Sequence, residues 1–241
     1  MPTTHKTALI TGAGSGMGRA IAKDLAGAGL RVALVGRDRT KLDAVAAEIG
    51  PSALVMPGDV ADREAIGKVV ADVLAEFGSI DVLICNAGIN TPKRALDVLD
   101  PADWDRLIAT NLTGAYNLVH HALPSMRTRG TGLVIQVASI AGMRASSVGG
   151  GAYAASKFGQ AALGIVLGRE ERLRGIKSSV IYPGEVETPI LENRPVPVSK
   201  ERRALILQPE DVAAAVRLLV ELPSRAHIPE LVIVPAVDDW A

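Results

Sequence analysis

The sequence predicts an α/β protein with a three-layer, doubly wound parallel sheet of about seven strands. Short apolar runs alternate with amphipathic helical segments along the chain, a pattern typical of strands joined by crossover helices. A glycine-rich turn, residues 12–18, lies between the first strand and the first helix. Apolar residues make up 48% of the chain and aromatic residues only 3%, so the core must consist of Ala, Val, Ile and Leu. Side chains of this size let helices pack closely against a parallel sheet.

The individual elements follow from the spacing of the apolar residues and from the residues that begin or end a helix. Asp62 and Asp100 are predicted helix N-caps, and Pro101 occupies a first-turn position that tolerates proline. The predicted strands are residues 7–11, 31–35, 53–56, 81–85, 132–137, 177–181 and 231–234. The predicted helices are residues 19–28, 39–49, 62–77, 100–125, 153–174 and 209–222. No repeat or linker divides the chain, so residues 1–241 are expected to form a single Rossmann-type domain.

The composition argues against several classes of protein. Lys plus Arg and Asp plus Glu both number 26, so the chain lacks the net basic charge of a nucleic-acid binder. Cys85 is the only cysteine, so no intrachain disulfide can form and a reducing compartment is expected. Residues 1–6 lack the apolar core of a signal peptide, and no apolar run approaches the length of a membrane span. The four histidines show no metal-ligand spacing. We expect a cytoplasmic protein that binds neither nucleic acid, membrane nor metal.

Tyr153 and Lys157 lie four residues apart and therefore on the same side of the predicted helix. A free tyrosine, with a pKa of about 10, is a poor proton donor at neutral pH. Lowering that pKa to about 7 requires roughly 4 kcal/mol of preferential stabilisation of the phenolate. A positive charge about 4 Å away, at an effective dielectric constant near 20, supplies about that much. We predict that Lys157 lowers the pKa of Tyr153, although pairs at this spacing are also common on solvated helix surfaces.

Polar and glycine residues gather where the predicted strands end. In a doubly wound sheet, ligands bind beyond the carboxyl ends of the strands. After the glycine turn, the later strand ends carry Gly36-Arg37, Asp59-Val60, Asn86-Ala87-Gly88, Ala138-Ser139 and Pro183-Gly184. Each alone is an ordinary turn sequence, but their concentration at one edge of the sheet predicts a ligand site. The glycine turn would let the backbone approach a diphosphate at the amino terminus of the following helix.

These motifs resemble those of the short-chain dehydrogenase/reductase family, in its single-domain branch. The family's Thr-Gly-x-x-x-Gly-x-Gly turn is matched by Thr11, Gly12, Gly16 and Gly18. The other signatures are matched, in order, by Asn86-Ala87-Gly88, Asn111, Ser139, Tyr153, Lys157 and Pro183-Gly184. The resemblance extends from residue 7 to about residue 235. It implies an oxidoreductase that transfers a hydride between a nicotinamide and a small carbonyl compound or secondary alcohol.

The resemblance also implies a role for each catalytic residue. Tyr153 would be the general acid or base, and Ser139 would hold the substrate oxygen. Lys157 would lower the tyrosine pKa and hydrogen-bond the nicotinamide ribose. Asn111, inside the long helix, would hold the proton relay behind Lys157 through its backbone and a water molecule. Without the resemblance, Ser139 is an ordinary strand-end turn and Asn111 a solvated helix position.

The second strand bears on the choice of nicotinamide. Family members that use NAD usually have an acidic residue at its end, where this chain has Gly36 followed by Arg37. A guanidinium suits the 2′-phosphate of NADP, so NADP is the expected cofactor. NAD is the alternative, because Asp38 could turn into the site and Ser15 replaces a basic residue of many NADP users. The resemblance implies a cofactor site made of Gly12, Ser15, Gly16, Met17, Gly18, Arg37, Asp59, Val60, Asn86, Ala87, Gly88, Tyr153, Lys157, Pro183, Gly184, Val186 and Thr188.

The substrate side of the site is less defined by the sequence. Residues placed either at its rim or in solvated loops are Arg94, Met143, Arg144 and Glu185. The Pro-rich stretch 189–207 is short for a lid, and residues 149–151 are three consecutive glycines. We therefore expect an open site with a mobile rim.

Other functions stay open at this point. A carrier-linked 3-oxoacyl reductase matches the motifs equally well. The sugar-nucleotide epimerases and dehydratases usually have a different glycine turn and a longer chain. A non-catalytic cofactor-binding protein is disfavoured by the intact set Asn111, Ser139, Tyr153 and Lys157. The resemblance implies a homotetramer or homodimer built on the helices that begin near Asp100 and Tyr153.

Overall fold

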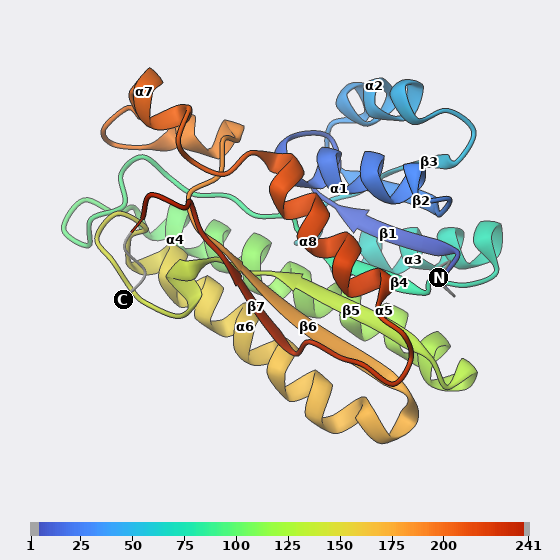
Figure 1. The fold of residues 1–241 in the computed structure, drawn as a ribbon. Coiled ribbons are helices and arrows are strands. Elements are labelled where there is room, and N and C mark those ends of the chain that lie inside the picture. The colour runs from blue at the N-terminus through green and yellow to red at the C-terminus, as the bar shows by residue number, and fades with distance from the viewer. Residues whose placement is uncertain (1–4, 239–241) are drawn as a thin grey trace.

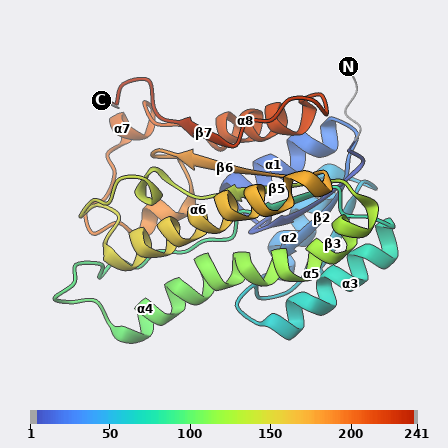
Figure 2. The same ribbon diagram turned by 90° about the horizontal axis from the view of Figure 1, so that it is seen from below.

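The computed structural model describes residues 5–238, in which helices cover both faces of a seven-stranded sheet (Figures 1 and 2). The expectation about a signal peptide in residues 1–4 lies outside the described residues. All strand pairings are parallel, in the order β3-β2-β1-β4-β5-β6-β7, so the predicted doubly wound sheet is confirmed. The strands are β1 (Thr7–Thr11), β2 (Arg31–Gly36), β3 (Ala53–Pro57), β4 (Val82–Cys85), β5 (Gly132–Val137), β6 (Ile176–Pro183) and β7 (Glu230–Ile233).

Two apolar cores lie on the two faces of this sheet. Alternate strand residues point to opposite faces, so Ala8 and Ile10 join one core and Leu9 joins the other. The first core is covered by α1 (Gly16–Gly27), α2 (Arg39–Ile49) and α8 (Pro209–Glu221). The second is covered by α3 (Arg63–Phe77), α5 (Gly114–Arg129) and α6 (Gly151–Glu171). The strand order reverses between β1 and β4, which opens a crevice at their carboxyl ends.

Helix α1 begins at Gly16, three residues before the predicted start at Arg19. A Cβ atom on Gly18 would lie 2.2 Å from the Gly12 carbonyl oxygen, so only glycine lets the first turn of α1 rest on the glycine turn. The earlier start brings the backbone N–H groups of this turn to the edge of the crevice.

The predicted single helix from residue 100 to 125 contains an irregular turn. It consists of α4 (Pro101–Ile108), a π-helical turn (Ala109–Thr113) and α5, which continues to Arg129. Such π turns often occur at functional sites, because they redirect side chains and backbone groups. Asn111 lies at the centre of this one.

The stretch from residue 189 to 207 is more ordered than predicted. It contains a 3₁₀ turn (Pro189–Asn193) and the short helix α7 (Lys200–Arg203). A single β-bridge between Val186 and Leu207 joins its two ends. The segment therefore leaves the sheet and returns to nearly the same place.

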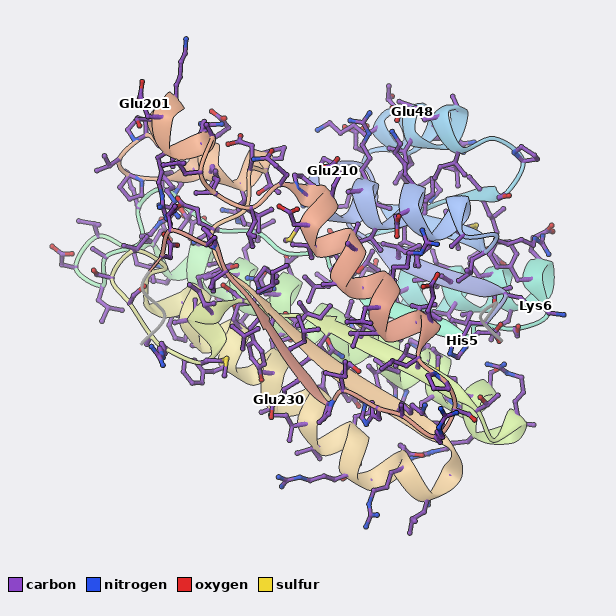
Figure 3. The ribbon with its side chains drawn as sticks, viewed as in Figure 1. His5, Lys6, Glu48, Glu201, Glu210 and Glu230 are labelled. Carbon is purple, nitrogen blue, oxygen red and sulfur yellow. The ribbon has the colours of Figure 1, made fainter. Side chains whose placement is uncertain are left out.

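Charged side chains mostly lie on the outside of the molecule, as Figure 3 shows for Glu48 and Glu230. Arg94 and Lys157 are exceptions, with only 7% and 3% of their surface exposed. Neither forms an ion pair with a carboxylate in residues 5–238. No helix in this part of the chain is long and apolar enough to cross a membrane.

Candidate active site

The carboxyl ends of β1 and β4 are held together by Thr11. Its hydroxyl donates to the Ile84 carbonyl at 3.2 Å and accepts from the backbone N–H groups of Asn86 and Ala87 at 3.0 and 3.1 Å. The side-chain amide of Asn86 adds a bond to the Thr11 carbonyl at 2.9 Å. These bonds fix the floor of the crevice.

One cavity of about 260 Å³ lies beside the glycine turn, at the ends of β1, β2 and β3. Of the predicted cofactor residues, those lining it are Gly12, Ser15, Arg37, Asp59, Val60, Ala87 and Gly88. Ser15 is the N-cap residue of α1, but its side chain makes no capping hydrogen bond, so N–H groups of the first turn lack a side-chain partner. This arrangement fits a diphosphate, which such N–H groups bind at a helix amino terminus.

Sequence reasoning missed several residues of this cavity. Lys41, in the first turn of α2, lines it together with Gly14, Leu42, Ile89 and Thr110. Lys41 carries a signal that could have identified it, because it lies one turn after the second strand end. In contrast, the predicted Asn86 lines neither this cavity nor the one described next. Its amide nitrogen is bonded to Thr11, and its Oδ1 atom is buried without a hydrogen-bond partner.

A second cavity of about 450 Å³ contains the predicted reactive side chains. Ser139, at the end of β5, and Tyr153, in the first turn of α6, both line it. The predicted cofactor residues in its wall are Met17, Pro183, Gly184, Val186 and Thr188. Thr188 also packs over the glycine turn, because a Cβ atom on Gly16 would lie 3.0 Å from its Cγ2 atom. The loop after β6 and the glycine turn are thus in contact.

Lys157 lies behind Tyr153, with its ammonium nitrogen 5.8 Å from the centre of the tyrosine ring. The ammonium donates to the Val137 carbonyl at 2.9 Å and to Gln160 Oε1 at 2.8 Å. Gln160 is held in turn, since its amide donates to the Cys85 carbonyl at 3.0 Å and to Gln136 Oε1 at 3.1 Å. Burial lowers the pKa of Lys157 to about 7.

The electrostatics of Tyr153 differ from our prediction. Burial raises its pKa above the ordinary value, while a hydrogen bond with Ser139 and the charge of Arg94 act in the opposite direction. Lys157 does not offset this effect of burial, because its ammonium is directed at Val137 and Gln160 and its own burial disfavours the charge. The net pKa of Tyr153 is raised, so the prediction that it falls below the ordinary value is wrong for this structure.

Asn111 is completely buried, unlike the solvated helix position that its sequence context alone suggests. Its side chain accepts from the Ile89 N–H at 2.8 Å and donates to the Ile89 carbonyl and the Ser156 hydroxyl, both at 3.0 Å. The π turn is thereby tied both to the loop after β4 and to α6. The water-mediated link from the Asn111 backbone to Lys157 stays a prediction.

At the rim of the second cavity, Arg94 and the predicted glycine segment 149–151 pack against each other. Arg94 and Glu185 line the cavity, whereas Met143 and Arg144 are exposed and do not. Gly150 has a φ of +81°, and a Cβ atom there would lie 2.7 Å from the Arg94 Cβ atom. The glycines thus allow close packing.

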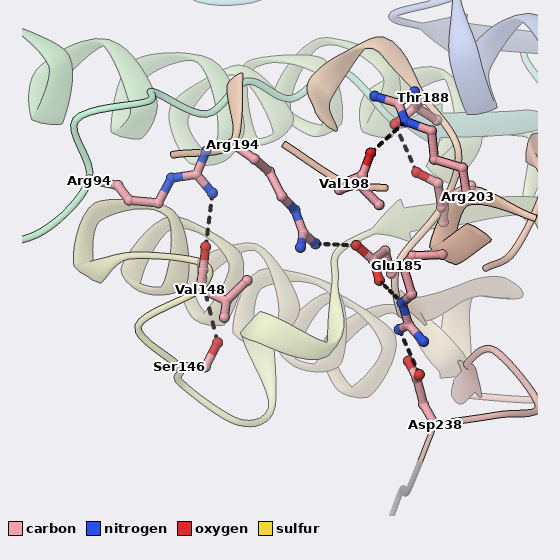
Figure 4. A network of polar contacts seen from close by, with 12 residues as sticks. Arg94, Ser146, Val148, Glu185, Thr188, Arg194, Val198, Arg203 and Asp238 are labelled. Atoms are coloured by element: carbon pink, nitrogen blue, oxygen red, sulfur yellow. Dashed lines mark hydrogen bonds and ion pairs between the residues drawn. The ribbon is translucent and has the colours of Figure 1, made fainter. Parts of the chain in front are cut away.

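The stretch from residue 189 to 207 forms part of the wall of this cavity. Ile190, Leu191 and Arg194 line the cavity wall. Arg194 and Arg202 both form ion pairs with Glu185, at 2.8 Å each (Figure 4). The stretch therefore contributes to the cavity wall, and the open site stays a prediction.

A doubly wound sheet with serine, tyrosine and lysine gathered at its carboxyl edge is the arrangement of a nucleotide-dependent oxidoreductase. The chain matches the profile of the short chain dehydrogenase family over residues 6–197, and it belongs to this family of oxidoreductases, which act on alcohols and ketones.

Individual proteins of this family are similar over nearly the whole chain. The cis-4-hydroxycyclohexanecarboxylate dehydrogenase of Sinomonas cyclohexanicum is 35% identical over 223 residues, which cover 89% of each chain. The 3-ketoacyl-(acyl-carrier-protein) reductase from Brucella melitensis, solved with NADH, is 30% identical, with a TM-score of 0.87 over 96% of this chain and 97% of that one. The alcohol dehydrogenase from the archaeon Thermococcus sibiricus, solved with 5-hydroxy-NADP, is 29% identical, with a TM-score of 0.86 over 98% of both chains.

Proposed function

We propose that this protein is an NADP-preferring oxidoreductase of carbonyl compounds and secondary alcohols, with Tyr153 as its general acid and base. The observation that carries the proposal is that Ser139 and Tyr153 line one cavity while Lys157 is buried directly behind the tyrosine. The nicotinamide, when bound, would supply or accept the hydride. Thr188 and the loop after β6 would hold it against the glycine turn.

The proton would move at the Tyr153 hydroxyl. In reduction Tyr153 donates to the substrate oxygen, while the Ser139 hydroxyl binds that oxygen and keeps it within reach. The phenolate that forms is a new negative charge in a buried site, and Lys157 is a buried cation 5.8 Å from the centre of the tyrosine ring. As the phenolate appears, the Lys157 ammonium gains an opposite charge, so each group stabilises the ionised form of the other. Asn111 would support this arrangement by fixing the backbone of Ile89.

The preference for NADP is supported by the cations and the carboxylate at the end of β2. Arg37 and Lys41 line the first cavity, where a 2′-phosphate would need positive charge. Asp38 also lines it, but its carboxylate caps α2 by accepting from the Lys41 N–H at 3.1 Å and pairs with the Lys41 ammonium at 3.5 Å. A carboxylate engaged in this way is a poor partner for the ribose hydroxyls of NAD.

Assembly and location complete the proposal. Tyr116 on α5 and Phe158 and Val166 on α6 are 42 to 49% exposed, an apolar surface suited to pairing with a second copy. We propose a homotetramer or homodimer built on these helices, in the cytoplasm. A carrier-linked 3-oxoacyl reductase is the alternative function, supported by the similarity to the Brucella melitensis enzyme.

The test is the reduction and oxidation of a panel of ketones, aldehydes and secondary alcohols by the wild type and by Tyr153→Phe, with NADP(H) and NAD(H) compared. We expect the variant to lose activity by about 10² to 10⁴-fold, because it retains the ring but not the proton. Nucleotide affinity should change little. Tyr116→Phe is the matched control, because it also removes a tyrosine hydroxyl but lies outside both cavities and keeps its apolar ring on α5; it should keep full activity. Equal rates for the wild type and Tyr153→Phe would overturn the mechanism, and equal kcat/KM with both nucleotides would overturn the NADP preference.

A further inference from the structure

Arg94 is a buried cation in the wall of the cavity that contains Ser139 and Tyr153. Its three guanidinium nitrogens donate to backbone carbonyls: Nε to Thr91 at 2.9 Å, Nη1 to Val148 at 2.8 Å, and Nη2 to Asn193. All three acceptors are neutral, and no carboxylate in residues 5–238 pairs with it. A buried guanidinium without a counter-charge is costly, so a residue of this kind calls for a functional reason.

The carboxylates that share this cavity are already engaged (Figure 4). Glu185 pairs with both Arg194 and Arg202 at 2.8 Å, and Asp238 pairs with Arg202 at 2.6 Å. Among residues 5–238, the charged lining therefore consists of three guanidiniums and two carboxylates, and the unbalanced charge among them belongs to Arg94. Figure 4 shows Arg194 between Arg94 and Glu185, so the positive side of the cavity extends from Arg94 to Arg194.

Hydrogen-bond donors remain on both arginines. A guanidinium has five N–H groups, and the hydrogen bonds to Thr91, Val148 and Asn193 occupy three of those on Arg94. The Oε1 atom of Glu185 has no aligned hydrogen bond despite its ion pair with Arg194, so the N–H groups of Arg194 are not directed at it. Two guanidiniums with further N–H groups in the wall of one cavity suit a carboxylate, whose two oxygens accept hydrogen bonds from such donors.

Hydrogen bonds and close packing fix the position of Arg94. The loop that carries it is fixed at Asn90, whose amide donates to the Gly149 carbonyl at 3.1 Å and whose carbonyl accepts from the Asn193 amide at 3.4 Å. Gly150 leaves room for the Arg94 Cβ atom and backbone. The guanidinium is close enough to Tyr153 to influence the phenol. Its distance from the reacting oxygen is thus set by the protein and not by a flexible side chain.

We propose that the substrate of this site is an oxo acid or hydroxy acid whose carboxylate binds to Arg94 and Arg194 while its carbonyl or hydroxyl lies at Ser139 and Tyr153. The inference rests on the proposed function for the reacting end of the molecule. The same cavity is lined by Ile140, Val148, Ile190 and Leu191, so the part of the substrate that joins its two polar ends is hydrocarbon. Recognition of a single carboxylate matches the one unbalanced positive charge in the part of the cavity wall that residues 5–238 form.

The first test measures binding, without turnover, to the protein saturated with NADP. Cyclohexanecarboxylate and its neutral isostere cyclohexanecarboxamide are compared by calorimetry or by the shift in melting temperature. We expect the carboxylate to bind about tenfold more tightly or better, as a charge-assisted hydrogen bond implies. Arg94→Gln should abolish the difference, whereas Arg94→Lys, which keeps the charge, should keep part of it. Equal binding of the two compounds by the wild type would overturn the proposal, whether or not the variants fold.

The second test measures kcat/KM for a series of oxo acids of increasing chain length, each beside its primary amide. We expect at least one acid to exceed its amide by about tenfold or more, and Arg194→Gln to reduce this ratio. Amides that match or exceed the acids throughout the series would overturn the carboxylate site. If the amides match or exceed the acids and Tyr153→Phe abolishes activity on both, the proposed function survives while this inference fails. If Tyr153→Phe is fully active on the acids, the proposed function fails instead.

Discussion

Replacing Lys157 with methionine should stabilise the protein near neutral pH while it abolishes turnover. Methionine has a similar unbranched shape, so the change removes the charge and the donor groups with little change in packing. Burial lowers the pKa of Lys157 to about 7. An unfolded lysine has a pKa of about 10.4, and each unit of difference corresponds to about 1.4 kcal/mol. Keeping this ammonium charged in the folded protein therefore costs about 5 kcal/mol.

The stabilisation is smaller than this cost, because Lys157 also satisfies two acceptors. The Val137 carbonyl and Gln160 Oε1 would each lose a hydrogen bond in Lys157→Met, at about 1 to 2 kcal/mol apiece. The net gain at pH 6 to 7 is then about 2 kcal/mol. For a chain of 241 residues this corresponds to a rise in melting temperature of about 4 to 8 °C.

The sign of the effect depends on pH. Between pH 7 and about 10.4 the unfolded wild type holds a proton on Lys157 that the folded wild type has released, so wild-type stability rises by about 1.4 kcal/mol per pH unit through this one group. Lys157→Met lacks this titrating group, so its stability does not rise with pH in this way. Its advantage should be greatest below pH 7 and should be lost between about pH 8 and 9.

Urea denaturation without nucleotide, at one-unit steps from pH 6 to 10, measures this crossing. The matched control is Lys23→Met, which removes an exposed lysine paired with Glu48 and should shift stability by less than about 1 kcal/mol at any pH. A Lys157→Met protein that is less stable than the wild type at every pH, by a constant amount, would show that the buried ammonium is not under electrostatic strain and would refute the reasoning.

Two further substitutions test how the site is held. Gln160→Glu would place a carboxylate against the Lys157 ammonium, which raises the pKa of the lysine and partly compensates its positive charge. The variant should therefore lower kcat by about 10-fold or more and shift the pH–rate profile, whereas Gln160→Asn should lower kcat without that shift. An unchanged pH–rate profile in Gln160→Glu would contradict this. Gly50→Ala, at a φ of +84° with open space around it, should cost about 1 to 3 kcal/mol in unfolding free energy from backbone strain alone and leave activity intact. Gly150→Ala, at a similar φ of +81°, adds a contact 2.7 Å from the Arg94 Cβ atom, so it should cost about 1 to 2 kcal/mol more than Gly50→Ala and impair activity. Equal losses of stability in the two variants would rule out the close contact as a cause.

The sheet and most helices could be predicted because local patterns determine them. Strands such as β1 are buried apolar runs, and α2 has the predicted bounds because Asp38 caps one end and Gly50 ends the other. The π turn around Asn111 could not be predicted, because its residues form an ordinary helical sequence. What sets it apart is contact with Ile89, which lies 22 residues away along the chain.

In the candidate site, too, local sequence motifs predict which residues are present, whereas contacts distant in the sequence determine how their side chains are directed. The motifs identified the residues around both cavities, since parallel strands bring their carboxyl ends to one edge. They did not reveal that Asn86 would face Thr11, nor that the Lys157 ammonium would turn to Gln160, because spacing does not determine the direction of a side chain. The buried charge of Arg94 was equally invisible, since it depends on loops far along the chain that close around it.

The two buried cations of this site share one design. Lys157 and Arg94 are each held by carbonyl or amide oxygens, which fix the position of a cation without neutralising its charge. A carboxylate in place of these acceptors would stabilise the folded protein more, but it would also reduce the pull of each cation on a ligand. On our proposals, the negative charges that complete the site arrive during function: the phenolate of Tyr153 for Lys157, and the substrate carboxylate for Arg94. The two uncompensated cations therefore make the free protein less stable, and the same electrostatic energy is gained when the substrate and the transition state bring their negative charges.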